Sequence, residues 1–173
     1  IMERCDYLII GAGVIGINIA WDLKKRFPSK KVILIEKEKY VGLHSSGRNS
    51  GVLHAGFYYT ADSLKAEFTK KGNQLTTDYC KVRKLKINIC GKVVVAKDET
   101  DLIGLDILME RGAANNIEVQ SISEQELHQL EPRAKTYKRA LFSPTTAVVD
   151  PKEVLADMLH QAIKAQVQFV EEC

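Results

Sequence analysis

The chain contains 173 residues, of which 45% are hydrophobic and 27% are charged. This composition excludes a disordered chain and predicts a globular domain with a core. The net charge of +3, from 25 basic and 22 acidic residues, gives no reason to expect a nucleic-acid partner. The densest basic stretch, Lys81–Lys86, has no interleaved aromatic residues and is interpreted as a solvated loop or strand edge.

The four cysteines have no CxxC spacing and no regular spacing to the four histidines. We therefore expect no metal site and no disulfide framework, and reduced thiols indicate a cytoplasmic location. The apolar N-terminal run is interrupted by glycines and Asn18 and is followed by Asp22 and Lys24. It is too short to span a membrane and has no cleavage site after a basic start, so neither a transmembrane helix nor a signal peptide is predicted.

The first predicted elements form a β-α-β unit. Residues Tyr7–Ile10 are a short apolar run before a glycine, which is typical of a buried parallel strand. Apolar residues at helical spacing follow from Val14 until Phe27 and Pro28, where the helix is expected to end. Residues Lys31–Glu36 then form a second buried strand. These elements predict an α/β fold with a parallel sheet.

A glycine-rich segment, Lys37–Thr60, follows without a sustained period. A loop of this length inside a compact domain usually binds a ligand. Asp62 and Ser63 can cap a helix that reaches about Cys80. Four of its apolar residues are expected to face the core, namely Leu64, Phe68, Leu75 and Tyr79.

The second half of the chain alternates strands and helices. The predicted strands are Cys90–Ala96, Ile117–Gln120, Ala140–Phe142 and Val167–Val170. The predicted helices start at Thr100 or Asp101, at Ser123 and at Asp150–Pro151, and they end near Asn115, Pro132 and Ala165. "SEQE" at Ser123 is read as a capping box, and Asp150 followed by proline is a strong helix start.

The glycines Gly11, Gly13 and Gly16 have the spacing G-x-G-x-x-G between the first strand and the first helix. The first permits a tight turn, the second a close approach to a pyrophosphate, and the third close packing of helix on sheet. Glu36 ends the second strand 20 residues after Gly16 (36 − 16). A carboxylate there can accept hydrogen bonds from a ribose and disfavours NADP. The motif predicts an adenine dinucleotide but does not separate FAD from NAD.

The next loop, Leu43–Tyr59, is dense in small residues and hydrogen-bond donors, which suits both a planar isoalloxazine ring and a pyrophosphate. It also contains His44 and His54. The composition of the loop alone favours surface positions for both histidines, whereas their placement among glycines favours a functional role. Both interpretations remain open from the residues.

Several motifs together resemble the N-terminal half of the L-2-hydroxyglutarate dehydrogenase/oxidase family, in the FAD-dependent D-amino-acid-oxidase-like superfamily. They are "GAGVIG", the "EK" after the second strand, "HSSGRNSGVLHAGFYY", "SLKAEF", "CGKVVVA", "LEP" and "AVVDP". The resemblance implies an FAD cofactor. It places the FAD pyrophosphate on Gly11, Gly13 and Gly16 and its ribose at Glu36. The other residues that it implies for the cofactor site are Lys37, Ser45, Ser46, Arg48, Asn49, Ser50 and Gly51.

The resemblance also implies that His54, after "NSGV", lies near the reacting centre. Arg48 departs from the family, whose members often carry histidine there, and this leaves the substrate open. The resemblance implies an α/β fold in which residues 1–85 and 145–173 form an incomplete Rossmann-like FAD-binding domain. Residues 86–144 would belong to a smaller α+β substrate domain inserted into it.

The function implied is oxidation of a 2-hydroxy acid, L-2-hydroxyglutarate to 2-oxoglutarate, with electrons passing to oxygen or to an acceptor on the inner membrane face. The chain resembles half of such an enzyme and is expected to be inactive alone. One alternative is a non-catalytic nucleotide-binding fragment that self-associates through an open edge near Val167–Val170 or needs a partner chain. Others are an FAD-linked glycerol-3-phosphate or amino-acid oxidoreductase, and an NAD-dependent dehydrogenase, which nothing after Glu36 supports.

Overall fold

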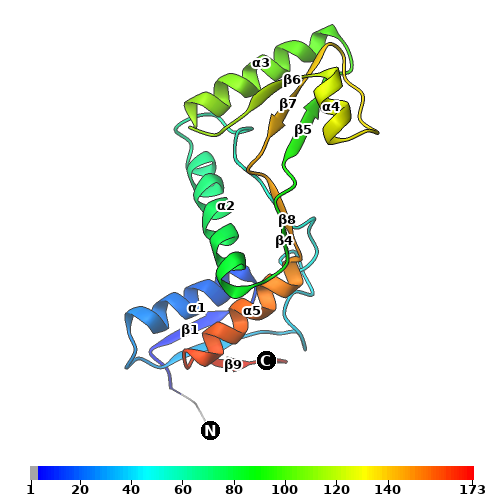
Figure 1. Cartoon of the computed structure of the whole chain (residues 1–173). Helices are drawn as coiled ribbons and strands as arrows, with labels where there is room; N and C mark the ends of the chain where they lie inside the picture. Colours follow the sequence, from blue (N-terminus) through cyan, green and yellow to red (C-terminus); the bar gives the residue numbers. More distant parts are fainter. Residues whose placement is uncertain (1–3) are drawn as a thin grey trace. The chain divides into compact units, whose positions relative to one another are not determined.

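The computed structural model describes residues 4–173, which form two compact units (Figure 1). The first unit contains residues 4–51 and 150–173, and the second contains residues 52–149. The elements of the first unit are β1 (Tyr7–Ile10), α1 (Val14–Arg26), β2 (Val32–Ile35), α5 (Pro151–Lys164) and β9 (Gln168–Val170).

The first unit is built on a parallel three-stranded sheet with the order β1-β2-β9. Tyr7 lies opposite Val32, and Ile35 lies opposite Val170. The β2 strand is central, and its buried residues lie beneath α1, which also packs against α5. The predicted β-α-β unit and the α/β fold class are therefore confirmed.

The second unit contains two antiparallel sheets, with the orders β3-β8-β4 and β5-β7-β6. Its strands are β3 (Val52–Leu53), β4 (Ile87–Asn88), β5 (Lys92–Val95), β6 (Gln120–Ser123), β7 (Arg139–Ser143) and β8 (Ala147–Val149). Its helices are α2 (Leu64–Arg83), α3 (Glu99–Ala114) and α4 (Glu124–Leu130). Leu105 of α3 packs on Leu141 of β7, and Leu127 of α4 packs on Ile122 and Ala140.

The two compact units differ from the expected domain boundaries. Residues 52–85 and 145–149 were expected in the FAD-binding domain but lie in the second unit. Strand pairing is the reason, because β3 and β4 both pair with β8 and so join these segments to one antiparallel sheet. The assignment of the units to cofactor and substrate remains a prediction.

The predicted helix starts are found at their caps. The Ser63 hydroxyl accepts a hydrogen bond from the Ala66 N–H at 3.1 Å. Ser123 and Glu126 form the capping box of α4. The Asp150 carboxylate accepts from the Lys152 N–H at 2.8 Å, with Pro151 in the first turn of α5. Short-range capping chemistry therefore sets the start of these three helices.

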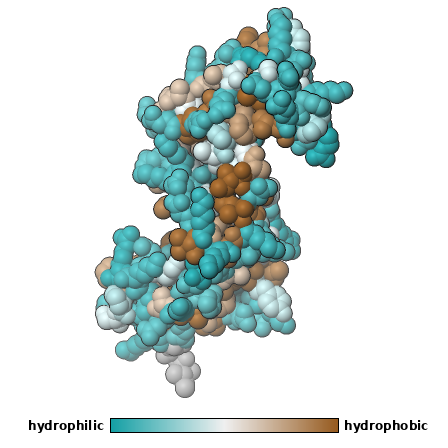
Figure 2. All heavy atoms as spheres, in the orientation of Figure 1, coloured by the Kyte–Doolittle hydropathy of each residue, from teal (hydrophilic) through white to brown (hydrophobic). Residues whose placement is uncertain are grey.

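The predicted core face of α2 is wrong. Leu64, Phe68 and Leu75 are 67%, 63% and 70% exposed. Figure 2 shows that hydrophobic residues, coloured brown, reach the surface of the protein between hydrophilic ones. The residues buried on α2 are instead Ala66, Thr77 and Cys80. The helix packs on its sheet mainly at the two-residue strands β3 and β4, and small side chains permit that close approach.

The strand expected at Ile117–Gln120 is displaced to Gln120–Ser123. The Ile117 N–H donates to the Gly112 carbonyl at 2.8 Å and closes the end of α3, so Ile117 belongs to the helix terminus. Its side chain packs with Ala55 and Phe57. Among the described residues, no helix is long and apolar enough to cross a bilayer. All four cysteines are free thiols.

Candidate functional site

The glycine turn after β1 has the backbone that its sequence predicts. Gly11 has a φ of +97°, and its N–H donates to the Ile35 carbonyl at 2.8 Å. A Cβ at Gly11 would project into open space, whereas a Cβ at Gly16 would overlap the Gly11 carbonyl oxygen. Glycine is therefore required at Gly11 by backbone conformation and at Gly16 by close packing.

The start of α1 is electropositive. Gly13 occupies the N-cap position without a side-chain cap, and the first turn carries no acidic residue. The last turn carries three basic residues, Lys24, Lys25 and Arg26. The Ser46 hydroxyl accepts the Val14 N–H at 3.0 Å, and a Cβ at Gly13 would lie 3.1 Å from the same oxygen. This arrangement leaves room and positive potential for a phosphate at the helix start.

A cavity of about 520 Å³ lies in the first unit at this helix start. Six of the residues expected to bind the cofactor line it, namely Gly11, Gly13, Gly16, Ser45, Ser46 and Asn49. Its other lining residues are Ile9, Ile10, Val14, Ile15 and Ile19. No charged side chain lines it. A diphosphate with an attached planar group fits this combination of backbone donors and apolar surface.

The loop that closes the cavity is held by Asn49. Its side-chain amide donates to the Ser45 and Ser46 carbonyls at 2.9 and 3.1 Å, and its oxygen accepts the Gly51 N–H at 2.9 Å. Gly51 is buried with a φ of +68°. Arg48 and Ser50 are exposed and do not line the cavity. Asn49 therefore fixes the conformation of the loop, and this conformation places Ser45 and Ser46 at the cavity.

Glu36 lies behind the glycine turn rather than in the cavity lining. One carboxylate oxygen accepts the Ala12 N–H at 2.8 Å, and the other accepts the Glu38 N–H at 3.1 Å. Each oxygen retains a lone pair that can accept a ribose hydroxyl. Lys37 is exposed, and its ammonium lies 3.3 Å from Glu38. The structure therefore gives Glu36 a structural role that the sequence did not predict.

His54 follows β3 in the second unit and is exposed. Partial desolvation of its ring and, second, the positive charge of Lys92 hold the pKa of His54 below its ordinary value of 6.5. Within residues 4–173 the ring has no hydrogen-bond partner. A neutral imidazole with a free ring nitrogen can accept a proton near neutral pH. His44 instead lies 2.9 Å from Glu38, and this contact holds the pKa of the Glu38 carboxyl below its ordinary value.

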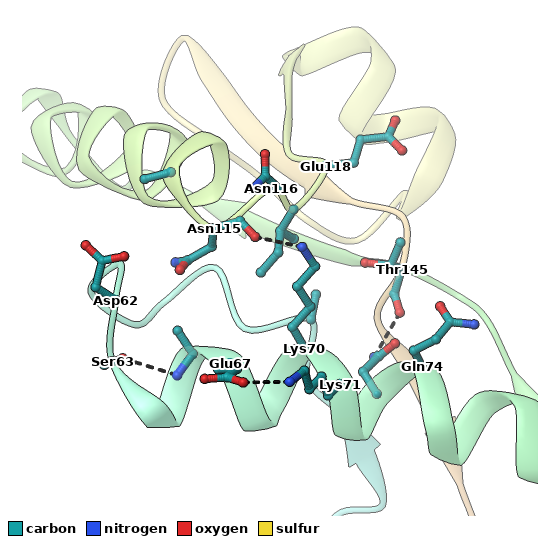
Figure 3. Close-up of a pocket in the computed structure, with 15 residues that line it drawn as sticks. Asp62, Ser63, Glu67, Lys70, Lys71, Gln74, Asn115, Asn116, Glu118 and Thr145 are labelled. Atoms are coloured by element: carbon teal, nitrogen blue, oxygen red, sulfur yellow. Dashed lines mark hydrogen bonds and ion pairs between the residues drawn. The ribbon is translucent and has the colours of Figure 1, made fainter.

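A larger cavity of about 860 Å³ lies in the second unit between α2 and the end of α3 (Figure 3). Lys70 reaches across it and donates to the Asn115 carbonyl at 3.0 Å. Lys71 pairs with Glu67 on the same helix at 2.6 Å. None of the residues expected at the cofactor or active site lines this cavity. Four of its charged groups, Glu67, Lys70, Lys71 and Glu118, already have protein partners, and we assign the cavity no role.

The comparison with known protein families decides between FAD and NAD. The family model described as FAD dependent oxidoreductase (DAO) matches residues 6–173. The chain belongs to this family. Membership in the DAO family confirms the predicted FAD cofactor.

The DAO-family chain is also similar to curated relatives. The L-2-hydroxyglutarate dehydrogenase of Escherichia coli strain K12 is 39% identical over 153 residues, which are 88% of this chain and 36% of the relative. The mitochondrial L-2-hydroxyglutarate dehydrogenase of Dictyostelium discoideum is 36% identical over 151 residues, which are 86% of this chain and 34% of the relative. The chain thus spans 34–36% of the length of these two relatives.

Solved structures show the same fold. The dithionite-reduced, FAD-bound L-alpha-glycerophosphate oxidase of Mycoplasma pneumoniae has a TM-score of 0.89 and 29% identity, covering 99% of this chain and 45% of that one. Glycine oxidase of Geobacillus kaustophilus has a TM-score of 0.85 and 23% identity, covering 99% and 47%. At that identity the second likeness concerns the fold alone. Both confirm a Rossmann-like fold of the FAD-dependent oxidoreductase type.

Sequence reasoning missed Lys92, whose charge acts on His54, and two residues at the link between β7 and β8, Ser143 and Thr146. Lys92 is the single charged residue of the strand "KVVV", and this break in an apolar strand is the one feature that could have singled it out. Ser143 and Thr146 are buried, and their hydroxyls have no hydrogen-bond partner among the described residues. Nothing in their sequence context distinguishes them from ordinary turn residues.

Proposed function

We propose that this chain supplies the FAD cradle and a proton acceptor to an enzyme that oxidises L-2-hydroxyglutarate to 2-oxoglutarate. One observation carries the proposal: a chain with 39% identity to an L-2-hydroxyglutarate dehydrogenase has its glycine turn, Ser45, Ser46 and Asn49 around one cavity. The low pKa of His54 supports the same chemistry, because a neutral ring is the form that accepts a proton.

The residues at the cavity fit FAD. Gly11, Gly13 and Gly16 with the N–H groups of the α1 start would hold the pyrophosphate, and Glu36 the ribose. The residues that would form the flavin side of the loop are Ser45, Ser46, Arg48, Asn49, Ser50 and Gly51, and Lys37 would lie beside the adenosine. The first turn of α1 contains no carboxylate that would repel a phosphate. This electrostatic match is independent of the family comparison.

His54 would take the proton of the substrate hydroxyl as the C2 hydrogen leaves. The C2–H bond would break with its electron pair as the C–O bond becomes a carbonyl, and FAD held by the glycine turn would supply the two-electron acceptor for that hydrogen. His54 then carries one additional proton, which it returns to solvent. Removing a positioned base of this kind typically costs about 10²- to 10⁴-fold in rate.

The test compares His54→Ala and His54→Gln with the unaltered sequence, each carried in a full-length enzyme of the family, because the chain alone is expected to be inactive. We expect flavin absorbance per protein to remain unchanged, while flavin reduction by L-2-hydroxyglutarate slows by about 10²- to 10⁴-fold. His160→Gln is a matched control, because His160 lies on α5 with its ring nitrogen 3.2 Å from Gln161. Equal reduction rates in His54→Ala and the control would refute the assigned role. An oxygen electrode then distinguishes oxygen from a membrane-bound electron acceptor.

A second candidate is oxidation of a glycerophosphate. The observation in its favour is the likeness to L-alpha-glycerophosphate oxidase at 29% identity. The higher identity of 39% to the hydroxyglutarate relative favours the hydroxy acid. Parallel reduction assays with L-2-hydroxyglutarate, its D enantiomer and glycerol 3-phosphate decide between them. A protein that takes up FAD but is reduced by none of the three would favour a non-catalytic nucleotide-binding fragment.

A further inference from the structure

Lys92 is a partly buried cation without an anionic partner. It begins β5, and its ammonium lies 4.4 Å from the centre of the Tyr58 ring. Within residues 4–173, no carboxylate forms an ion pair with it at 4.0 Å or less. The Tyr58 ring offsets part of the loss of hydration but does not neutralise the charge. An ammonium in this state attracts an anion more strongly than an exposed lysine does.

Strand register places Lys92 and His54 on either side of the link between β7 and β8 in the second unit. Lys92 lies opposite Ser143 in the β5–β7 pair. The Gly91 N–H donates to the Thr146 carbonyl at 3.0 Å. The β3–β8 register ends with Leu53 opposite Ala147, so the next residues on the two strands are His54 and Thr146. The turn between β7 and β8 therefore lies between the lysine and the histidine.

The same turn contains two buried hydroxyls that have no hydrogen-bond partner among the described residues. Ser143 is 1% exposed and Thr146 is 3% exposed. Buried hydroxyls are nearly always hydrogen-bonded in folded proteins. Directly opposed residues of an antiparallel pair project to the same face, which places the Ser143 side chain on the face of Lys92. Ser143 thus brings one buried, unsatisfied hydroxyl to the sheet face of the unpaired cation.

We propose that Lys92 binds a carboxylate group of a small organic acid beside His54. A carboxylate accepts hydrogen bonds at two oxygens, which suits one ammonium and an adjacent hydroxyl. The inference rests on the proposed function and deepens it. Lys92 would hold a carboxylate of the 2-hydroxy acid, and His54 would face its hydroxyl group.

The charges of Lys92 and His54 favour an anion that lies close to both residues. Without an anion, Lys92 disfavours the protonated ring of His54. A bound carboxylate offsets that repulsion, so His54 accepts a proton more readily once the acid is bound. The lysine would therefore act both as the anchor for the ligand and as a control on the base.

The experiment measures binding of 2-oxoglutarate to the protein by NMR, through the shift of the His54 ring resonance. K92M should weaken binding by about 10- to 100-fold, the range expected for loss of a hydrogen bond to a charged group. K92R keeps the charge and should remain within a few-fold of the unaltered protein. The matched control is K97M, because Lys97 is exposed and follows the other end of β5. The same titration with inorganic phosphate tests whether the site takes phosphate instead.

Two outcomes overturn the inference: 2-oxoglutarate affinity of K92M equal to that of K97M, or tighter binding of phosphate than of 2-oxoglutarate. The pKa of His54 in the free protein provides a readout that a purely structural lysine would not move, and it should rise in K92M but not in K97M. If K92M does not fold, K92Q carries the same comparison. Weaker 2-oxoglutarate binding in K92M without any oxidation of L-2-hydroxyglutarate would support this site while refuting the proposed function. Oxidation of L-2-hydroxyglutarate by K92M with an unchanged KM would support the proposed function while refuting the carboxylate site at Lys92.

Discussion

Replacing Glu36 by glutamine should destabilise the first unit by about 2.5–4 kcal/mol even without FAD. The Glu36 side chain accepts two backbone N–H groups, from Ala12 at 2.8 Å and from Glu38 at 3.1 Å. Hydrogen bonds to a charged group contribute roughly 1.5–3 kcal/mol each, and neutral ones about 1 kcal/mol. Glutamine can keep one neutral bond, to Ala12, but its amide group then meets the Glu38 N–H as a second donor. The loss is thus about 1 kcal/mol at Ala12 and about 1.5–3 kcal/mol at Glu38.

The assay is urea unfolding of the FAD-free protein, followed by the fluorescence of Trp21. This residue is the single tryptophan of the sequence and lies on α1, so it reports on the first unit. Glu38→Gln is the matched control. The Glu38 carboxylate contacts His44 and Lys37, which are both exposed, so its contribution is small. Equal unfolding midpoints for Glu36→Gln and Glu38→Gln would show that Glu36 does not hold the glycine turn.

Three further predictions concern other parts of the fold and site. Gly16→Ala should displace the start of α1, because its Cβ would overlap the Gly11 carbonyl; we expect a loss of about 1–3 kcal/mol and no flavin absorbance after purification with FAD. Ser123→Ala removes half of the capping box with Glu126 and should cost about 1 kcal/mol in denaturant unfolding, whereas Ser121→Ala on the exposed face of β6 should cost little. The pKa of His54 is held below 6.5, so the acid limb of the kcat/KM profile should have its midpoint below pH 6.5, and a midpoint above it would contradict a neutral base. The unfolded chain binds that proton more readily, so any contribution of His54 to stability is lost as pH falls below 6.5.

The sequence predicts elements that depend on neighbouring residues. The starts of α2, α4 and α5 follow from Ser63, Ser123 and Asp150, each of which caps a backbone group within three residues. The glycine turn is equally local, because Gly16 packs against the carbonyl of Gly11, which precedes it by only five residues. Capping and turn chemistry are decided within a few residues, so they can be read without knowledge of the tertiary structure.

Features that depend on distant partners could not be predicted in this way. The apolar pattern of α2 predicts a buried face for Leu64, Phe68 and Leu75, yet these are exposed because the helix approaches its sheet through smaller residues. The strands β3, β4 and β8 are only two or three residues long. Such strands have no measurable period, and β3 and β4 form because each pairs with β8, across 58 residues or more of intervening sequence (89–146 for β4).

The same distinction separates the two halves of the candidate site. The FAD-binding turn can be predicted from the sequence, because it binds the cofactor through backbone N–H groups and glycines at a fixed spacing. The effect of Lys92 on His54 cannot be predicted from the sequence. It depends on the pairing of β5 with β7 and of β3 with β8, which are distant in the sequence. Partial desolvation and Lys92 keep the His54 ring neutral in the free protein, and the negative charge of a bound ligand would offset the effect of Lys92 when the ring accepts a proton. In the proposed Lys92 site, the carboxylate of the ligand would carry this negative charge, so the register of these two strand pairs, and not any local motif, would determine how the site recognises its ligand.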